Sequence, residues 1–171
     1  MNLKEKIQES LKKSARNKKE KELMVLRLLS ASILNKEKEK RYNISKEKPE
    51  LKEQDLLIQS QLSDDEVIKI IQSEIKKRKE AISWFEKGER TEMAEKEKEE
   101  QKFLEKYLPE QLLDEDIKKL AKESVGKTGV SEIKDIGKVM AELMPKIKGR
   151  AGGSRVSDIV KQILISKKQE Q

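Results

Sequence analysis

The chain has 171 residues, of which 43% are charged and 34% apolar, and its net charge is +7. It contains no cysteine and no histidine, which excludes disulfides and thiol chemistry and removes the commonest general base and metal ligand. No apolar run approaches the roughly 18 residues of a membrane span, and the first residues do not resemble a signal peptide. We therefore expect a cytoplasmic protein that uses neither a metal nor a cofactor.

The apolar residues are few but recur with helical periodicity, and aromatic residues make up only 3% of the chain. This combination predicts an all-α protein.

Residues 1–46 carry 14 Lys and Arg against 6 Asp and Glu, residues 47–125 carry 16 against 22, and residues 126–171 carry 10 against 5. Both ends are therefore basic and would attract a polyanion such as RNA. Solvated faces of Lys/Glu-rich helices would show the same composition.

The N-terminal part predicts two helices followed by an irregular segment. The first helix covers residues 3–15 and the second covers residues 19–41, where Glu37 and Arg41 are spaced to form an ion pair. The helical phase then breaks, so residues 42–62 are expected to be a long loop with at most one or two helical turns.

A stronger helix signal follows at Ser63. Ser63 and Glu66 form a capping-box pattern that begins a helix, and Gly88 is its expected C-cap. Within this helix Glu74 and Arg78 are spaced for an ion pair, which we interpret as structural. The expected core face comprises Val67, Ile70, Ile71, Ile75, Ile82 and Phe85.

The next predicted helix runs from Thr91 to about Tyr107 and is rich in glutamate. Its carboxylates could form a metal or acid/base site, but the interleaved lysines favour a surface helix with many ion pairs. Pro109 then marks the clearest boundary. We therefore predict a helical N-terminal domain at residues 1–108 and a small C-terminal domain at residues 109–171.

The C-terminal domain is expected to contain three short helices, at about residues 114–125, 131–144 and 154–166. Pro145 is predicted to end the second of these helices. The loop that follows is basic and glycine-rich, and it leads into the third helix near Ser154. Free backbone N–H groups at a helix start favour an anion such as phosphate. A solvated connector between two helices would have the same composition.

Three long motifs connect this chain to a known family: Lys77-Arg-Lys-Glu-Ala-Ile-Ser-Trp-Phe-Glu-Lys-Gly88, Leu104-Glu-Lys-Tyr-Leu-Pro-Glu-Gln-Leu112, and the stretch from Gly137 through Lys146-Ile-Lys-Gly-Arg-Ala151. With these motifs the chain resembles the YqeY-like family, also called the GatB/YqeY domain family. The resemblance implies an all-α protein with a helical N-terminal domain and a three-helix C-terminal domain. Similar modules form the tail of the B subunit of the glutamine-dependent tRNA amidotransferase and are appended to some glutaminyl-tRNA synthetases, where they are taken to contact tRNA.

The loop and the family signature together give a set of candidate tRNA-binding residues. Two departures from the family pattern stand out: Gly152 occupies a position that is usually acidic, and the connection at residues 42–62 is longer than usual. The candidate residues are Lys138, Lys146, Lys148, Gly149, Arg150 and Arg155.

Three functions remain open at this point. The first is a non-catalytic accessory module that binds the tRNA backbone. The second is an amidotransferase, a carbon–nitrogen ligase with glutamine as nitrogen donor, as the family label suggests. Without cysteine or histidine, however, the chain has neither a thiol glutaminase nor a Ser–His triad. The third is an interaction module that docks an aminoacyl-tRNA synthetase or an amidotransferase subunit.

Overall fold

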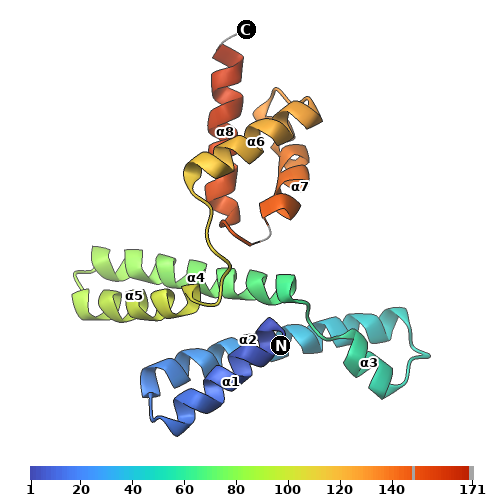
Figure 1. Cartoon of the computed structure of the whole chain (residues 1–171), viewed down its shortest axis with the longest axis vertical. Helices are drawn as coiled ribbons and strands as arrows, with labels where there is room; N and C mark the ends of the chain where they lie inside the picture. The colour runs from blue at the N-terminus through green and yellow to red at the C-terminus, as the bar shows by residue number, and fades with distance from the viewer. Residues whose placement is uncertain (148, 170–171) are drawn as a thin grey trace. The chain divides into compact units, whose positions relative to one another are not determined.

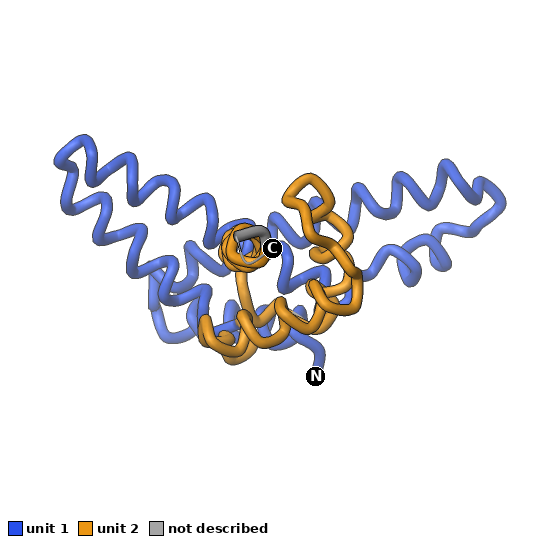
Figure 2. Tube along the Cα trace, turned by 90° about the horizontal axis from the view of Figure 1, so that it is seen from above, with its two compact units in different colours: residues 1–107 blue, residues 108–171 orange. Residues whose placement is uncertain are grey.

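The computed structural model of the chain describes residues 1–147 and 149–169. These residues form helices and no strand, which confirms the predicted all-α class. They gather into two compact units, Met1–Tyr107 and Leu108–Gln171 (Figure 2). None of the helices in this described part is long and apolar enough to span a membrane.

The first unit contains five helices (Figure 1), in which α1 packs against α2 and α4 packs against α5. Both α1 and α4 begin with the same device. In each, the side chain of the N-cap residue, Asn2 or Ser63, accepts a hydrogen bond from the third helical N–H, and the glutamate at that position bonds back to the cap backbone. The capping box predicted at Ser63 is therefore confirmed. The bounds are α1 Leu3–Arg16, α2 Glu20–Glu47, α3 Glu53–Gln59, α4 Asp64–Lys87 and α5 Thr91–Glu105.

Helix α2 is longer than the sequence pattern indicated. It continues through Tyr42 to Glu47, so the prediction of a loop from residue 42 was wrong for its first six residues. The amphipathic phase does break there, but the helix meets no strong breaker before Pro49, which disfavours helical geometry in the residue ahead of it. The rest of the segment follows the prediction, with two helical turns in α3.

The predicted pair between Glu37 and Arg41 is wrong, because each side chain has a partner on another element. Glu37 is buried and accepts a hydrogen bond of 2.6 Å from Lys4 Nζ of α1. Arg41 Nε donates to Ser60 Oγ at 3.3 Å. These contacts join α2 to the helices on either side of it in the chain.

Arg78 joins α4 to α5 through a buried ionic cluster. The predicted pair with Glu74 is present, with 3.5 Å between Arg78 Nη1 and Glu74 Oε2. The same guanidinium meets two carboxylates of α5, Glu100 at 3.0 Å and Glu97 at 4.0 Å. The glutamates of α5 are thus engaged in holding the helices together, in agreement with the interpretation of α5 as a helix with many ion pairs.

The described residues of the second unit form three α-helices, labelled in Figure 1, and one short 3₁₀ helix, η1. Its core is a single cluster to which all three α-helices contribute, including Ile117, Leu143 and Val160, all of which have no more than 1% of their surface exposed. Such a core is built from aliphatic side chains, since this unit has no aromatic residue. The bounds are α6 Asp114–Thr128, η1 Ile133–Asp135, α7 Ile136–Ile147 and α8 Gly153–Gln169.

Several helix ends in this unit differ from the prediction: α7 begins at Ile136 and not at residue 131, and α8 continues to Gln169 instead of ending near residue 166. Helix α6 passes through Gly126 and ends at Gly129, which has φ of 65° in the left-handed region. Helix α7 includes Pro145 and continues to Ile147, so the predicted stop at the proline was wrong. A proline in the last turn removes only one hydrogen bond, and the burial of Ile147 in the core holds the turn in place.

Candidate nucleic-acid interface

The glycine-rich loop between α7 and α8 is tied to the segment that precedes α6. The N–H of Leu112 donates to the carbonyl of Arg150 at 2.8 Å, and Arg150 Nε donates to the carbonyl of Glu110 at 3.1 Å. Gly149 has φ of 75°, a conformation that requires glycine or strains another residue. Ala151 is fully buried. The loop therefore has one defined conformation at these positions, as a binding loop would need.

Most of the predicted cations near this loop are paired within the chain. Lys138 Nζ lies 3.0 Å from Asp135 Oδ1, and Arg155 Nε donates to Asp114 Oδ1 at 2.8 Å. Lys148, another predicted residue, lies outside the described residues. The guanidinium of Arg150 has no carboxylate within 4.0 Å in the described part of the chain, so its charge remains available.

Lys146 is the most extensively engaged of the predicted residues. Its Nζ lies 3.0 Å from Glu142, 3.2 Å from Glu123 and 3.3 Å from Ser124 Oγ. The hydrogen bond to Glu142 raises the pKa of Lys146, and the bond to Glu123 adds to this while burial works against it. The contacts with Glu123 and Ser124 join α7 to α6. They indicate a structural role for Lys146, which the sequence analysis proposed as a tRNA contact.

The structure also shows a basic groove that the sequence analysis missed. It lies between α6 and the C-terminal half of α8, has a volume of about 470 Å³, and has Val125, Ile159 and Ile163 among its lining residues. Three lysines also line it: Lys118, Lys122 and Lys167.

These three lysines have no acidic neighbour among the described residues. None of them has a carboxylate within 4.0 Å in residues 1–147 and 149–169, and no acidic residue lines the groove. Coulomb attraction from three uncompensated ammonium groups favours a polyanion such as a phosphate backbone. The spacing of Lys118 and Lys122, one helical turn apart, was visible in the sequence. The proximity of Lys167 was not, because it depends on how α8 packs against α6.

Residues 1–147 and 149–169 contain no group of three or more His, Cys, Asp or Glu side chains that could hold a metal ion.

The first turn of α8 carries no acidic residue that would compete with an anion for its N–H groups.

Fold and site together define an all-helical protein of two units, the second of which carries a lysine-lined groove. The family model described as Yqey-like protein matches residues 4–164. The chain therefore belongs to the YqeY-like family, as its sequence motifs predicted. A search of curated proteins finds no significant match to this chain.

Proposed function

We propose that this chain is a non-catalytic accessory module that binds the backbone of tRNA in the cytoplasm and assists a tRNA-charging enzyme. The observation that carries the proposal is the groove between α6 and α8, in which three lysines have no carboxylate within 4.0 Å in the part of the chain that the structure describes. The family resemblance supports tRNA over other polyanions. The lack of cysteine and histidine supports a role in binding and not in catalysis.

Recognition would depend on phosphate and sugar contacts and not on the bases. Residues 108–171 contain no Phe, Tyr, Trp or His, so this unit lacks the aromatic platforms on which unpaired bases stack. Lysine ammonium groups position a backbone without reading its sequence. We therefore expect tRNAs of different sequence to bind with similar affinity.

The glycine-rich loop is a second proposed contact. Arg150 and Lys148 are its candidates for direct phosphate contacts, with Gly149 providing the close backbone approach. In this proposal Lys146 joins α7 to α6 and Arg155 joins α8 to the start of α6, while Lys138 pairs with Asp135 at the end of α7 away from the loop.

The test is a salt-titrated binding isotherm of the whole protein with total tRNA. We expect Lys118/Lys122/Lys167→Gln to weaken binding at least tenfold and to reduce the slope of log K against log salt by about 2 to 3, because each lost phosphate contact removes roughly 0.7 to 0.9. Lys148/Arg150→Ala tests the loop in parallel, and we expect a smaller loss. Lys146 is kept in this variant because its contacts with Glu123 and Ser124 join α7 to α6.

The matched control is Lys6/Lys12/Lys13→Gln, which removes the same charge from exposed positions of α1. If the control weakens binding as much as the groove variant does, the attraction depends on net charge alone and the groove is not the site. If wild-type protein binds no tRNA at low salt, the proposal fails as a whole.

A further inference from the structure

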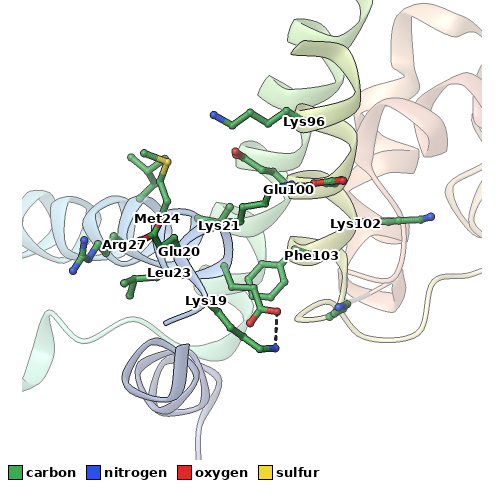
Figure 3. A pocket seen from close by; sticks show the side chains of 15 residues that line it. Lys19, Glu20, Lys21, Leu23, Met24, Arg27, Lys96, Glu100, Lys102 and Phe103 are labelled. Carbon is green, nitrogen blue, oxygen red and sulfur yellow. Dashed lines mark hydrogen bonds and ion pairs between the residues drawn. The ribbon is translucent and has the colours of Figure 1, made fainter. Parts of the chain in front are cut away.

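The first unit contains a large groove that the tRNA proposal does not use. It lies between the first turns of α2 and the C-terminal half of α5 and has a volume of about 1170 Å³. Figure 3 shows Met24 and Arg27 on the α2 side and Lys96, Glu100 and Phe103 on the α5 side. The groove exceeds the roughly 300 to 1,000 Å³ of a small-molecule pocket and is open to solvent, so it suits part of a macromolecule better.

The groove exposes more apolar than polar surface. Met24 and Leu28 lie one helical turn apart on α2 and have 56% and 53% of their surface exposed. The partly buried side chains of Leu23 and Phe103 also line it. Single exposed apolar residues are common in soluble proteins, but a group of them in one groove marks an interaction surface.

The charges around this surface are not balanced within the chain. Three of its four glutamates are already paired: Glu22 with Lys19 at 3.0 Å, Glu99 with Lys21 at 2.8 Å, and Glu100 with Arg78 at 3.0 Å. Only Glu20 remains to balance the other basic residues of the lining. Those residues have no carboxylate within 4.0 Å in the described part of the chain: Arg27, Lys96, Lys102 and Lys106.

We propose that this groove binds an amphipathic helix of a partner protein, with the apolar face of that helix on Met24, Leu28 and Phe103 and its acidic flanks near the four cations that have no carboxylate partner in the described part of the chain. The lining consists of two helices and offers no sheet edge, so a helix in the groove is the binding mode that fits. Nucleic acid would satisfy the cations, but its backbone has no apolar face to cover the exposed methionine and leucine.

A synthetic peptide of about 18 residues tests the proposal directly. Its leucines follow i, i+3, i+4 and i+7 spacing, its other faces carry glutamate, and it has a fluorescent label for anisotropy measurements. We expect binding in the micromolar range that weakens as salt is added. A peptide of the same composition in scrambled order should bind at least tenfold more weakly, because its leucines no longer share one face.

Variants of the whole protein locate the binding surface. Leu28→Asp and Lys96→Glu should each weaken binding about tenfold or more, while Ile58→Asp, at an apolar position of α3 that is 67% exposed, should leave it unchanged. Circular dichroism of each variant checks that it is folded, which we expect because the substituted positions are exposed.

Three outcomes of the peptide experiments would overturn the proposal. They are no binding of the patterned peptide to wild-type protein, equal binding of the scrambled peptide, and equal binding to Leu28→Asp. Binding of short single-stranded RNA that Leu28→Asp abolishes would also overturn it, since it would assign the groove to nucleic acid.

Discussion

Glu66 shows how one residue can begin a helix and join it to another. Its carboxylate bonds back to the Ser63 backbone N–H at 2.8 Å and accepts two hydrogen bonds of 2.9 Å from Lys40 Nζ of α2. Partial burial disfavours the charged carboxylate, but the hydrogen bonds from Ser63 and Lys40 outweigh it, so the pKa of Glu66 is lowered. The charged form therefore stabilises the folded protein.

The lowered pKa gives Glu66→Gln a pH-dependent effect. Glutamine keeps the capping geometry but loses the charge, so we expect a loss of about 0.5 kcal/mol in the free energy of unfolding at pH 7, the size of a half-exposed ion pair. A carboxylate whose pKa is lower in the folded than in the unfolded protein stabilises the fold at pH values above its unfolded pKa. This stabilisation is lost as the pH falls through the folded pKa. The difference between wild type and variant in urea unfolding should therefore begin to shrink below about pH 4 to 5, near the unfolded pKa of glutamate, and disappear once the pH has fallen through the lower folded pKa.

Glu9→Gln, at an exposed position of α1, is the control and should show no such pH dependence. A wild-type-minus-variant difference for Glu66→Gln that stays constant from pH 7 to pH 3 would contradict the prediction, because it would mean that the charge of Glu66 does not matter.

At the residue scale, contacts within one helical turn could be predicted from the sequence more readily than contacts between helices. The capping box of Ser63 and Glu66 lies within one helical turn, so its pattern is visible in the chain. Lys146 was proposed as a ligand contact although Glu142, one helical turn before it, is spaced for an ion pair, and its second partner Glu123 is 23 positions away and comes close only after α7 packs on α6. For the same reason the α6–α8 groove was missed.

At the element scale, α6 contains two glycines with opposite roles. Gly126 lies inside the helix, while Gly129 ends it with φ of 65°. A Cβ atom at either position would have no heavy atom within 4 Å beyond its chain neighbours and the local helix backbone, so crowding does not distinguish them. Backbone conformation alone should therefore decide the effect of adding a side chain.

We expect Gly126→Ala to stabilise the protein by about 0.5 to 1 kcal/mol, because alanine loses less conformational entropy in a helix. Gly129→Ala should destabilise it by about 1 to 2 kcal/mol, because a left-handed conformation places Cβ close to the backbone. Urea unfolding of both variants beside wild type measures the two differences. A shift of the same sign in both would show that backbone conformation is not the deciding factor.

Helix lengths were less predictable than helix positions. Each α-helix of the structure corresponds to a predicted one or, for α3, to the turns allowed in residues 42–62. Tyr42 and Pro145 misled the prediction because both interrupt a local pattern without ending the helix. Where a helix ends depends on small free-energy differences between the preferences of the backbone and the packing of side chains. Packing against residues that are distant in the chain is not visible in a local sequence pattern.

At the scale of the whole molecule, each unit has its own core. Leu143 is fully buried in the core of the second unit, and its replacement by alanine should lower the stability of that unit by about 3 kcal/mol. A unit this small has little stability to spare. In hydrogen exchange, we expect the amides of α6 and α8 to lose protection while those of α4 keep it.

Leu113→Ala is the matched control, since Leu113 has 69% of its surface exposed and its truncation should change stability by less than about 0.5 kcal/mol. An equal loss of protection in α4 and in α6 for Leu143→Ala would show that the two cores unfold as one.

The arrangement of the first unit also determines how fast it can form. Its strongest pairings join helices that are neighbours in the chain, α1 with α2 and α4 with α5, and each pair is connected by only three residues, 17–19 and 88–90. Little chain entropy is lost before such contacts form, so contact order is low in these hairpins. Rapid-mixing experiments should find that they form within roughly milliseconds, a rate typical of helical bundles. During synthesis on the ribosome, the first hairpin can therefore be complete before α4 has emerged.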